Sequence, residues 1–97
     1  MVKRSTVPGS TNVELEAALR AEGLDPFTWA QDGPYFYEPH DHDYISVLVC
    51  SKGSIVFHVD GDDVELRPGD RLDVPAGVTH AATVPDEGVE VVEAIVQ

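Results

Sequence analysis

Apolar and polar residues follow two different patterns along the chain of 97 residues. Near the N-terminus, three apolar residues recur at the spacing of one helix face: Leu15, Ala18 and Leu19. Thr11 followed by Glu14 is typical of an N-terminal capping box, and Gly23 is a natural stop. These signals predict one short helix over about residues 12–22, preceded by an irregular arm over residues 1–10.

After Pro26 the helical period is lost. Short apolar runs instead alternate with Gly, Pro and Asp turns about every 8–12 residues, which is typical of an all-β sandwich or barrel. Asp60-Gly61 between two apolar runs is the clearest hairpin signal. The expected strands cover 27–31, 34–39, 44–50, 54–59, 62–66, 71–74, 79–84 and 89–96. We therefore expect a single domain over residues 11–97, with a β-barrel over about 27–96.

The charge balance narrows the classes of function. Six Lys and Arg residues stand against 18 Asp and Glu, for a formal net charge of −12. Such a chain repels phosphate backbones and anionic membrane surfaces. Lys3 and Arg4 are followed by no apolar segment of the kind a signal peptide requires, and the single Cys50 excludes an intrachain disulfide. We expect a cytoplasmic protein that binds neither nucleic acid nor membranes.

Two of the four histidines, His40 and His42, are separated by one residue. On a strand, residues i and i+2 share a face, so both imidazoles can converge on one point. A third imidazole from another strand would complete a metal site, and imidazole suits zinc, iron, copper and nickel. By itself the pair is equally consistent with two surface histidines in a polar loop.

The spacing of residues in two blocks of the chain strengthens the case for a metal site. His40-Asp-His42 is followed by Gly53, and Gly69-x5-Pro75-x-Gly77-x2-His80 comes later. Together these blocks resemble the two sequence motifs of the cupin superfamily, over about residues 34–96. The resemblance implies an all-β double-stranded β-helix, the jelly roll of small single-domain cupins, with the one short N-terminal helix. It also implies one divalent ion per chain (Fe, Zn, Mn or Ni), with three metal ligands: His40, His42 and His80.

The sequence departs from the family motifs at two positions. Ser46 stands where the first motif has a glutamate ligand, and Val84 stands where the second has an asparagine. Neutral serine is a poor ligand, so three ligands are expected and the fourth is open. Tyr44 and Ser46 share the parity of the histidine pair and are candidate pocket residues. No residue is assigned as a catalytic acid or base.

Two classes of function follow from the resemblance. Three neutral imidazoles leave a divalent ion with its full charge, which favours an anionic chelating ligand. The chain would then be a metal-dependent oxygenase or isomerase/lyase acting on a small organic acid. The alternative is a non-catalytic module that binds a small molecule in the same barrel, with or without metal. Small cupins commonly dimerise, so a homodimer is expected.

The other notable residues have simpler interpretations. His58 lies outside both motifs and is expected to be a packed or hairpin-edge histidine, and Cys50 a small core residue. The aromatic residues within 27–37 are expected to cover the barrel or a subunit contact, with ligand stacking as the less favoured alternative. The acidic residues of 60–65 and 86–93 are interpreted as solvated faces and turns.

Overall fold

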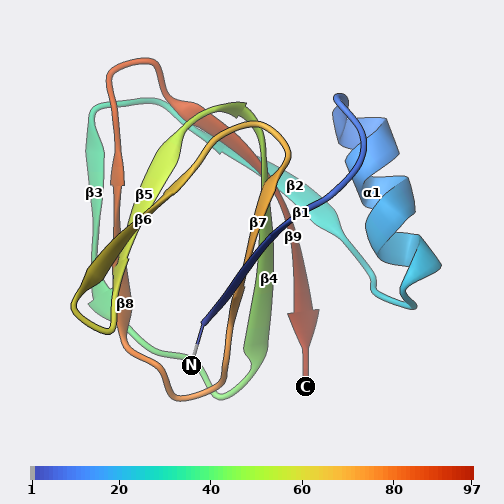
Figure 1. Ribbon diagram of the computed structural model, residues 1–97. Helices are drawn as coiled ribbons and strands as arrows, with labels where there is room; N and C mark the ends of the chain where they lie inside the picture. The colour runs from blue at the N-terminus through green and yellow to red at the C-terminus, as the bar shows by residue number, and fades with distance from the viewer. Residues whose placement is uncertain (1) are drawn as a thin grey trace.

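The computed structural model describes residues 2–97 as two antiparallel β-sheets that face each other, with one helix outside them (Figure 1). One sheet has the strand order β1-β7-β4-β9-β2 and the other has the order β3-β8-β5-β6. This arrangement confirms the all-β class with one short N-terminal helix. The elements are β1 (Lys3–Thr6), α1 (Asn12–Ala21), β2 (Phe27–Gln31), β3 (Tyr35–His40), β4 (Ile45–Gly53), β5 (Ile55–Val59), β6 (Asp62–Leu66), β7 (Asp70–Val74), β8 (His80–Val84) and β9 (Val89–Val96).

Strand β4 is buried on both faces, because it lies in the middle of the five-stranded sheet. Leu48 and Cys50 point between the sheets, where they pack with residues such as Ile55 and Leu72. Val47 and Val49, which alternate with these residues along β4, belong to a second apolar cluster on the outer face of the same sheet. Burial on both faces explains why this strand reads as a continuous apolar run, as in a sheet covered on both sides.

Helix α1 covers that outer face (Figure 1). Its capping box forms as expected, since Thr11 Oγ1 accepts from the Glu14 amide at 3.2 Å and Glu14 Oε1 accepts from the Thr11 amide at 3.1 Å. Leu15 and Leu19 are fully buried against the sheet. The helix therefore closes one side of the five-stranded sheet and leaves the other side to the interior. Over residues 2–97, no helix is long and apolar enough to cross a membrane.

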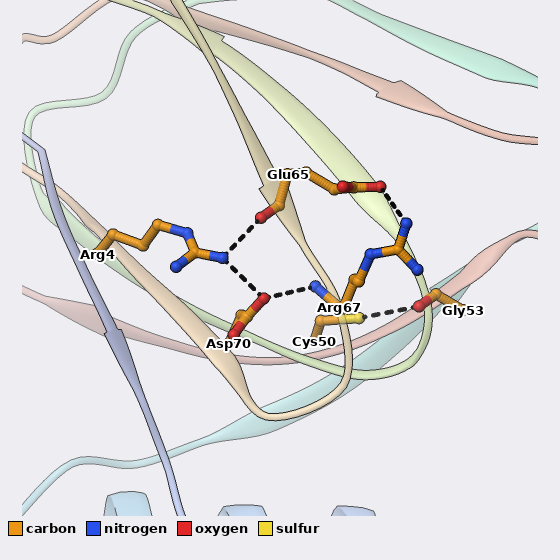
Figure 2. A network of polar contacts seen from close by, with 6 residues as sticks. All are labelled: Arg4, Cys50, Gly53, Glu65, Arg67 and Asp70. Carbon is orange, nitrogen blue, oxygen red and sulfur yellow. Dashed lines mark hydrogen bonds and ion pairs between the residues drawn. The ribbon is translucent and has the colours of Figure 1, made fainter.

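The irregular arm expected over residues 1–10 is wrong for Lys3–Thr6, which form the edge strand β1 on β7. These residues carry no apolar alternation, so strand formation here depends on pairing with a distant partner rather than on local propensity. The Arg4 guanidinium adds to the pairing by donating to Asp70 Oδ2 at 2.9 Å and to the Glu65 carbonyl at 3.2 Å (Figure 2). The same Asp70 oxygen accepts from the Arg67 amide, which ties the edge strand to the β6–β7 turn.

Cys50 is the buried core residue that the sequence predicts. Its Sγ lies 3.6 Å from the carbonyl oxygen of Gly53 (Figure 2). Burial, only partly offset by the hydrogen bond to the Lys52 carbonyl, raises the pKa of the thiol to about 11.

We expect the native Cys50 thiol to resist a disulfide reagent such as DTNB at about pH 8, because the thiolate is the reactive form. Unfolding in guanidinium chloride should then release one reactive thiol per chain. Release of the coloured thiolate, followed by absorbance in native and unfolded samples, measures the difference. Equal rates in the two samples would contradict the burial of this thiol.

Candidate metal and ligand site

Three histidines meet at one end of the space between the sheets. His40 is the last residue of β3, His80 the first of β8, and the two are cross-strand partners. The ring centroids lie 4.4 Å apart for His40 and His80, 4.8 Å for His40 and His42, and 5.4 Å for His42 and His80. One ring nitrogen from each histidine lies within 4.8 Å of the other two. Three imidazole nitrogens therefore surround one point.

The route by which His42 reaches this point differs from the expected one. Strand β3 ends at His40 after a register shift, so His42 lies in the β3–β4 connection and not on a shared strand face. Its backbone carbonyl accepts from the Gly77 amide at 2.7 Å. Gly77 has a φ of +80°, a conformation that glycine adopts without a side-chain penalty. This hydrogen bond from the turn of the second motif therefore fixes the position of the loop that carries His42 of the first motif.

The hydrogen bonds of two rings leave the other ring nitrogen free for a ligand. His40 Nδ1 lies 2.8 Å from the Glu38 carbonyl oxygen, and His80 Nδ1 lies 2.9 Å from the Val78 carbonyl oxygen. A carbonyl oxygen only accepts, so each Nδ1 carries the proton and each Nε2 presents a lone pair. Fixing the tautomer in this way is the usual support for a metal-binding histidine. The donor set therefore fits a divalent metal ion.

Burial also favours the neutral form of the His80 ring. It is 5% exposed, and burial is the main reason that its pKa lies below the usual value. The neighbouring His40 and His42 lower the pKa further, whereas the bond to Val78 acts in the opposite direction. A neutral imidazole is the form that coordinates a metal.

The histidines line one side of a pocket of about 360 Å³. This volume suits a small ligand, and the lining combines an apolar wall with a few polar groups, as is common in ligand sites. The apolar wall contains Phe27, Trp29, Tyr37, Leu48, Phe57 and Ile95. Beside the histidines, polar groups come from Tyr44, Ser46 and Glu93. Ligand contact was the less favoured interpretation of the aromatic residues, yet Phe27, Trp29 and Tyr37 face this pocket.

Both candidate pocket residues, Tyr44 and Ser46, line the pocket. Ser46 is buried on β4, opposite Val74 and Ile95 in the sheet register, and it lines the pocket. Tyr44 precedes β4 and stacks on the His42 ring with a centroid distance of 4.5 Å and an angle of 13°. A hydroxyl and a phenol therefore border the histidine cluster, and the hydroxyl of Ser46 stands where the family motif has a glutamate.

Glu93 is the pocket residue that sequence reasoning missed. The interpretation of residues 86–93 as solvated is wrong at this position, because the Glu93 side chain is half-buried and lines the pocket. Trp29 Nε1 donates to its Oε1 at 2.8 Å. Burial is the main cause that raises the pKa of the carboxyl group, although the Trp29 bond and His40 act to lower it. The signal was present in the sequence: Glu90 and Glu93 have opposite parity on one strand, so one of them had to face inward.

His58 lies away from the pocket, as expected for a histidine outside both motifs. Its Nδ1 lies 2.7 Å from Asp63 Oδ1 and its Nε2 lies 2.7 Å from Thr83 Oγ1. The ring is 35% exposed. It connects neighbouring strands on the outer face of the four-stranded sheet and does not contribute to the histidine cluster.

The paired sheets, the two motifs and the histidine cluster define a small cupin domain. The chain belongs to the family described as AraC-like ligand binding domain, which matches residues 23–91. The comparison with curated proteins gave no match.

Solved structures with the same fold come from several kinds of protein. Acireductone dioxygenase from Bacillus anthracis, solved with a cadmium ion in its active centre, has a TM-score of 0.76 and 19% identity, covering 99% of this chain and 78% of that one. A cupin superfamily protein from Desulfitobacterium hafniense has a TM-score of 0.67 and 14% identity, with coverage of 99% and 77%. The DMSP lyase DddQ from Ruegeria pomeroyi has a TM-score of 0.70 and 21% identity over 76% of this chain, which spans only 38% of the lyase. At these identities the comparisons establish the fold.

Proposed function

We propose that the chain binds one divalent metal ion through His40, His42 and His80, and that the ion holds a small organic acid in the pocket. The observation that carries this proposal is the convergence of three imidazole nitrogens within 4.8 Å at the side of the pocket. The bonds from His40 and His80 to backbone carbonyls support it, because they leave Nε2 of each ring unprotonated and able to coordinate a metal.

The donor set and the pocket wall together favour the class of ligand. No carboxylate stands at position 46, so three neutral imidazoles would leave a divalent ion with its full charge, which attracts an anionic chelator. The apolar wall favours a ligand with a short hydrocarbon body. A bound ion would polarise a coordinated carbonyl or acidify a coordinated water. In this proposal Tyr44 and Ser46 orient the acid beside the histidines by hydrogen bonding.

We expect purified protein to hold about one divalent ion per chain after it is loaded with Fe(II), Zn(II), Mn(II) or Ni(II) and dialysed. Elemental analysis measures the stoichiometry, and competition among the four metals identifies the preferred one. Imidazole donors favour iron, zinc or nickel over manganese. Protein that retains none of the four metals would overturn the proposed function.

The second candidate is a metal-free module that binds the small molecule without changing it. Two observations favour it: the match to a family described by ligand binding, and the absence of a carboxylate ligand at Ser46. Calorimetry with butyrate and its hydroxy derivatives separates the candidates. Binding that disappears when a chelator removes the metal supports the metal-dependent site, whereas binding unchanged by the chelator supports the metal-free module.

A further inference from the structure

Glu93 places a carboxylate in a wall that is otherwise mostly apolar. Its partners in the sheet register are Phe27 on β2 and Leu48 on β4, and its neighbours on the same face of β9 are Val91 and Ile95. Taking a carboxylate out of water into such surroundings costs free energy unless hydrogen bonds replace the lost water. Because burying this carboxylate destabilises the folded protein, its presence in the pocket wall makes Glu93 a candidate for a functional role.

The hydrogen bonding of Glu93 is incomplete in the direction of the pocket. Within residues 2–97, its one side-chain hydrogen bond is from Trp29 Nε1 to Oε1. That bond comes from a side chain that also lines the pocket, so it fixes the orientation of the carboxylate there. The second oxygen, Oε2, keeps its capacity to accept a hydrogen bond. The structure thus presents a positioned acceptor in the same pocket as the histidine cluster.

We propose that Glu93 binds a hydroxyl group of the ligand, so that the preferred ligands are hydroxycarboxylic acids with one carboxylate. The inference rests on the proposed function, in which the carboxylate of the acid is held at the histidine cluster. Oε2 of Glu93 then accepts from a hydroxyl further along the carbon chain. Trp29 is the positioning residue, since it holds the carboxylate of Glu93 through Oε1.

Charge selects the hydroxyl among the available donors and excludes a second carboxylate. An ammonium group would share a pocket of about 360 Å³ with a divalent ion, which repels it. A second carboxylate on the ligand would meet the like charge of Glu93 in the same small space. A neutral hydroxyl satisfies Oε2 without either penalty.

The test compares metal-loaded wild-type protein with variants at position 93, using butyrate, 3-hydroxybutyrate and 4-hydroxybutyrate as probes in calorimetric titrations. We expect the wild type to bind at least one hydroxy acid about tenfold more tightly than butyrate, because hydrogen bonds to charged groups are strong. Glu93→Met should bind all three probes equally, and Glu93→Gln should show a reduced preference. The matched control is Glu90→Met, which changes an acidic residue on the opposite face of β9 and should keep the wild-type preference.

Thermal unfolding and the ratio of probe affinities together separate ligand binding from a merely structural role. If Glu93 only holds Trp29 in place, Glu93→Met should lower the melting temperature and leave the ratio of probe affinities unchanged. If the inference is correct, the affinities of the three probes should become equal whatever the change in melting temperature, because Glu93→Met also leaves the Trp29 N–H without its acceptor. Glu93→Gln keeps an acceptor for Trp29 and provides the test if the methionine variant does not fold.

Measuring metal binding by the wild-type protein distinguishes failure of this inference from failure of the proposed function. Wild-type protein that binds metal but shows no preference for a hydroxy acid would overturn the role of Glu93 and leave the metal site standing. A preference for hydroxy acids that persists in Glu93→Met would likewise overturn the role of Glu93 without affecting the proposed metal site. Failure of the wild type to bind metal would instead overturn the proposed function itself.

Discussion

Replacing His80 by alanine is expected to lower the affinity for a divalent metal ion by at least about 100-fold. Loss of an outer partner of a metal ligand commonly costs about 10–100-fold, so loss of the ligand itself should reach or exceed that range. His80 is also the only member of the cluster on β8, and without it two imidazoles from one stretch of chain would remain. Titration with Zn(II) against a competing chromophoric chelator measures the affinity.

The matched control is His58→Ala. His58 is the same residue type on the neighbouring strand β5, but its ring nitrogens face Asp63 and Thr83 rather than the pocket. We expect this variant to bind metal as the wild type does. Circular dichroism of both variants verifies that each is folded. Equal metal affinity in His80→Ala and the wild type would remove His80 from the site.

A large effect on stability is expected for Gly53→Ala. Gly53, which ends the first motif, has a φ of +70°, and a Cβ there would lie 2.0 Å from the Gly88 carbonyl oxygen. That obstacle is backbone of the adjoining turn and cannot rotate away like a side chain. Left-handed strain and this clash together should lower the free energy of unfolding by on the order of 4 kcal/mol, which is large for one substitution. Urea unfolding measures the change.

Gly61→Ala provides the control, because it isolates the conformational part of this effect. Gly61 has a φ of +78°, yet a Cβ at this position would have no atom within 4 Å. We expect a loss of only about 1 kcal/mol, the cost of placing a side chain in the left-handed region. Equal losses for the two variants would show that the contact between Gly53 and Gly88 carries no energetic weight.

Local chemistry made most elements of this fold predictable. Thr11 and Glu14 marked the start of α1, and the alternation of apolar runs with turns marked the strands from β2 to β9. Strand β1 was missed because Lys3–Thr6 have no apolar face and depend on pairing with β7. The homodimer and the cytoplasmic location stay predictions.

The sequence indicated the histidine cluster of the candidate site but not most of the pocket wall. The resemblance to the cupin motifs implied His40, His42 and His80 as metal ligands, and the structure brings these three side chains together. The aromatic wall and Glu93 come from β2, β3 and β9, and no motif connects these strands to the histidines. Parity states which residues share a face, but not which part of the interior that face borders.

The sequence by itself determined the helix, the strand segments from β2 to β9, the charge and the three candidate histidines, since each depends on residues close together or on motif spacing. Tertiary structure decided how these parts meet. A hydrogen bond from the Gly77 amide to the His42 carbonyl positions His42 beside the other two histidines, and Glu93 on β9 lines the same pocket. The bond between Gly77 and His42 joins residues 35 positions apart, and the bond that orients Glu93 joins it to Trp29, 64 positions away. Both bonds depend on tertiary packing rather than on a local preference of the chain.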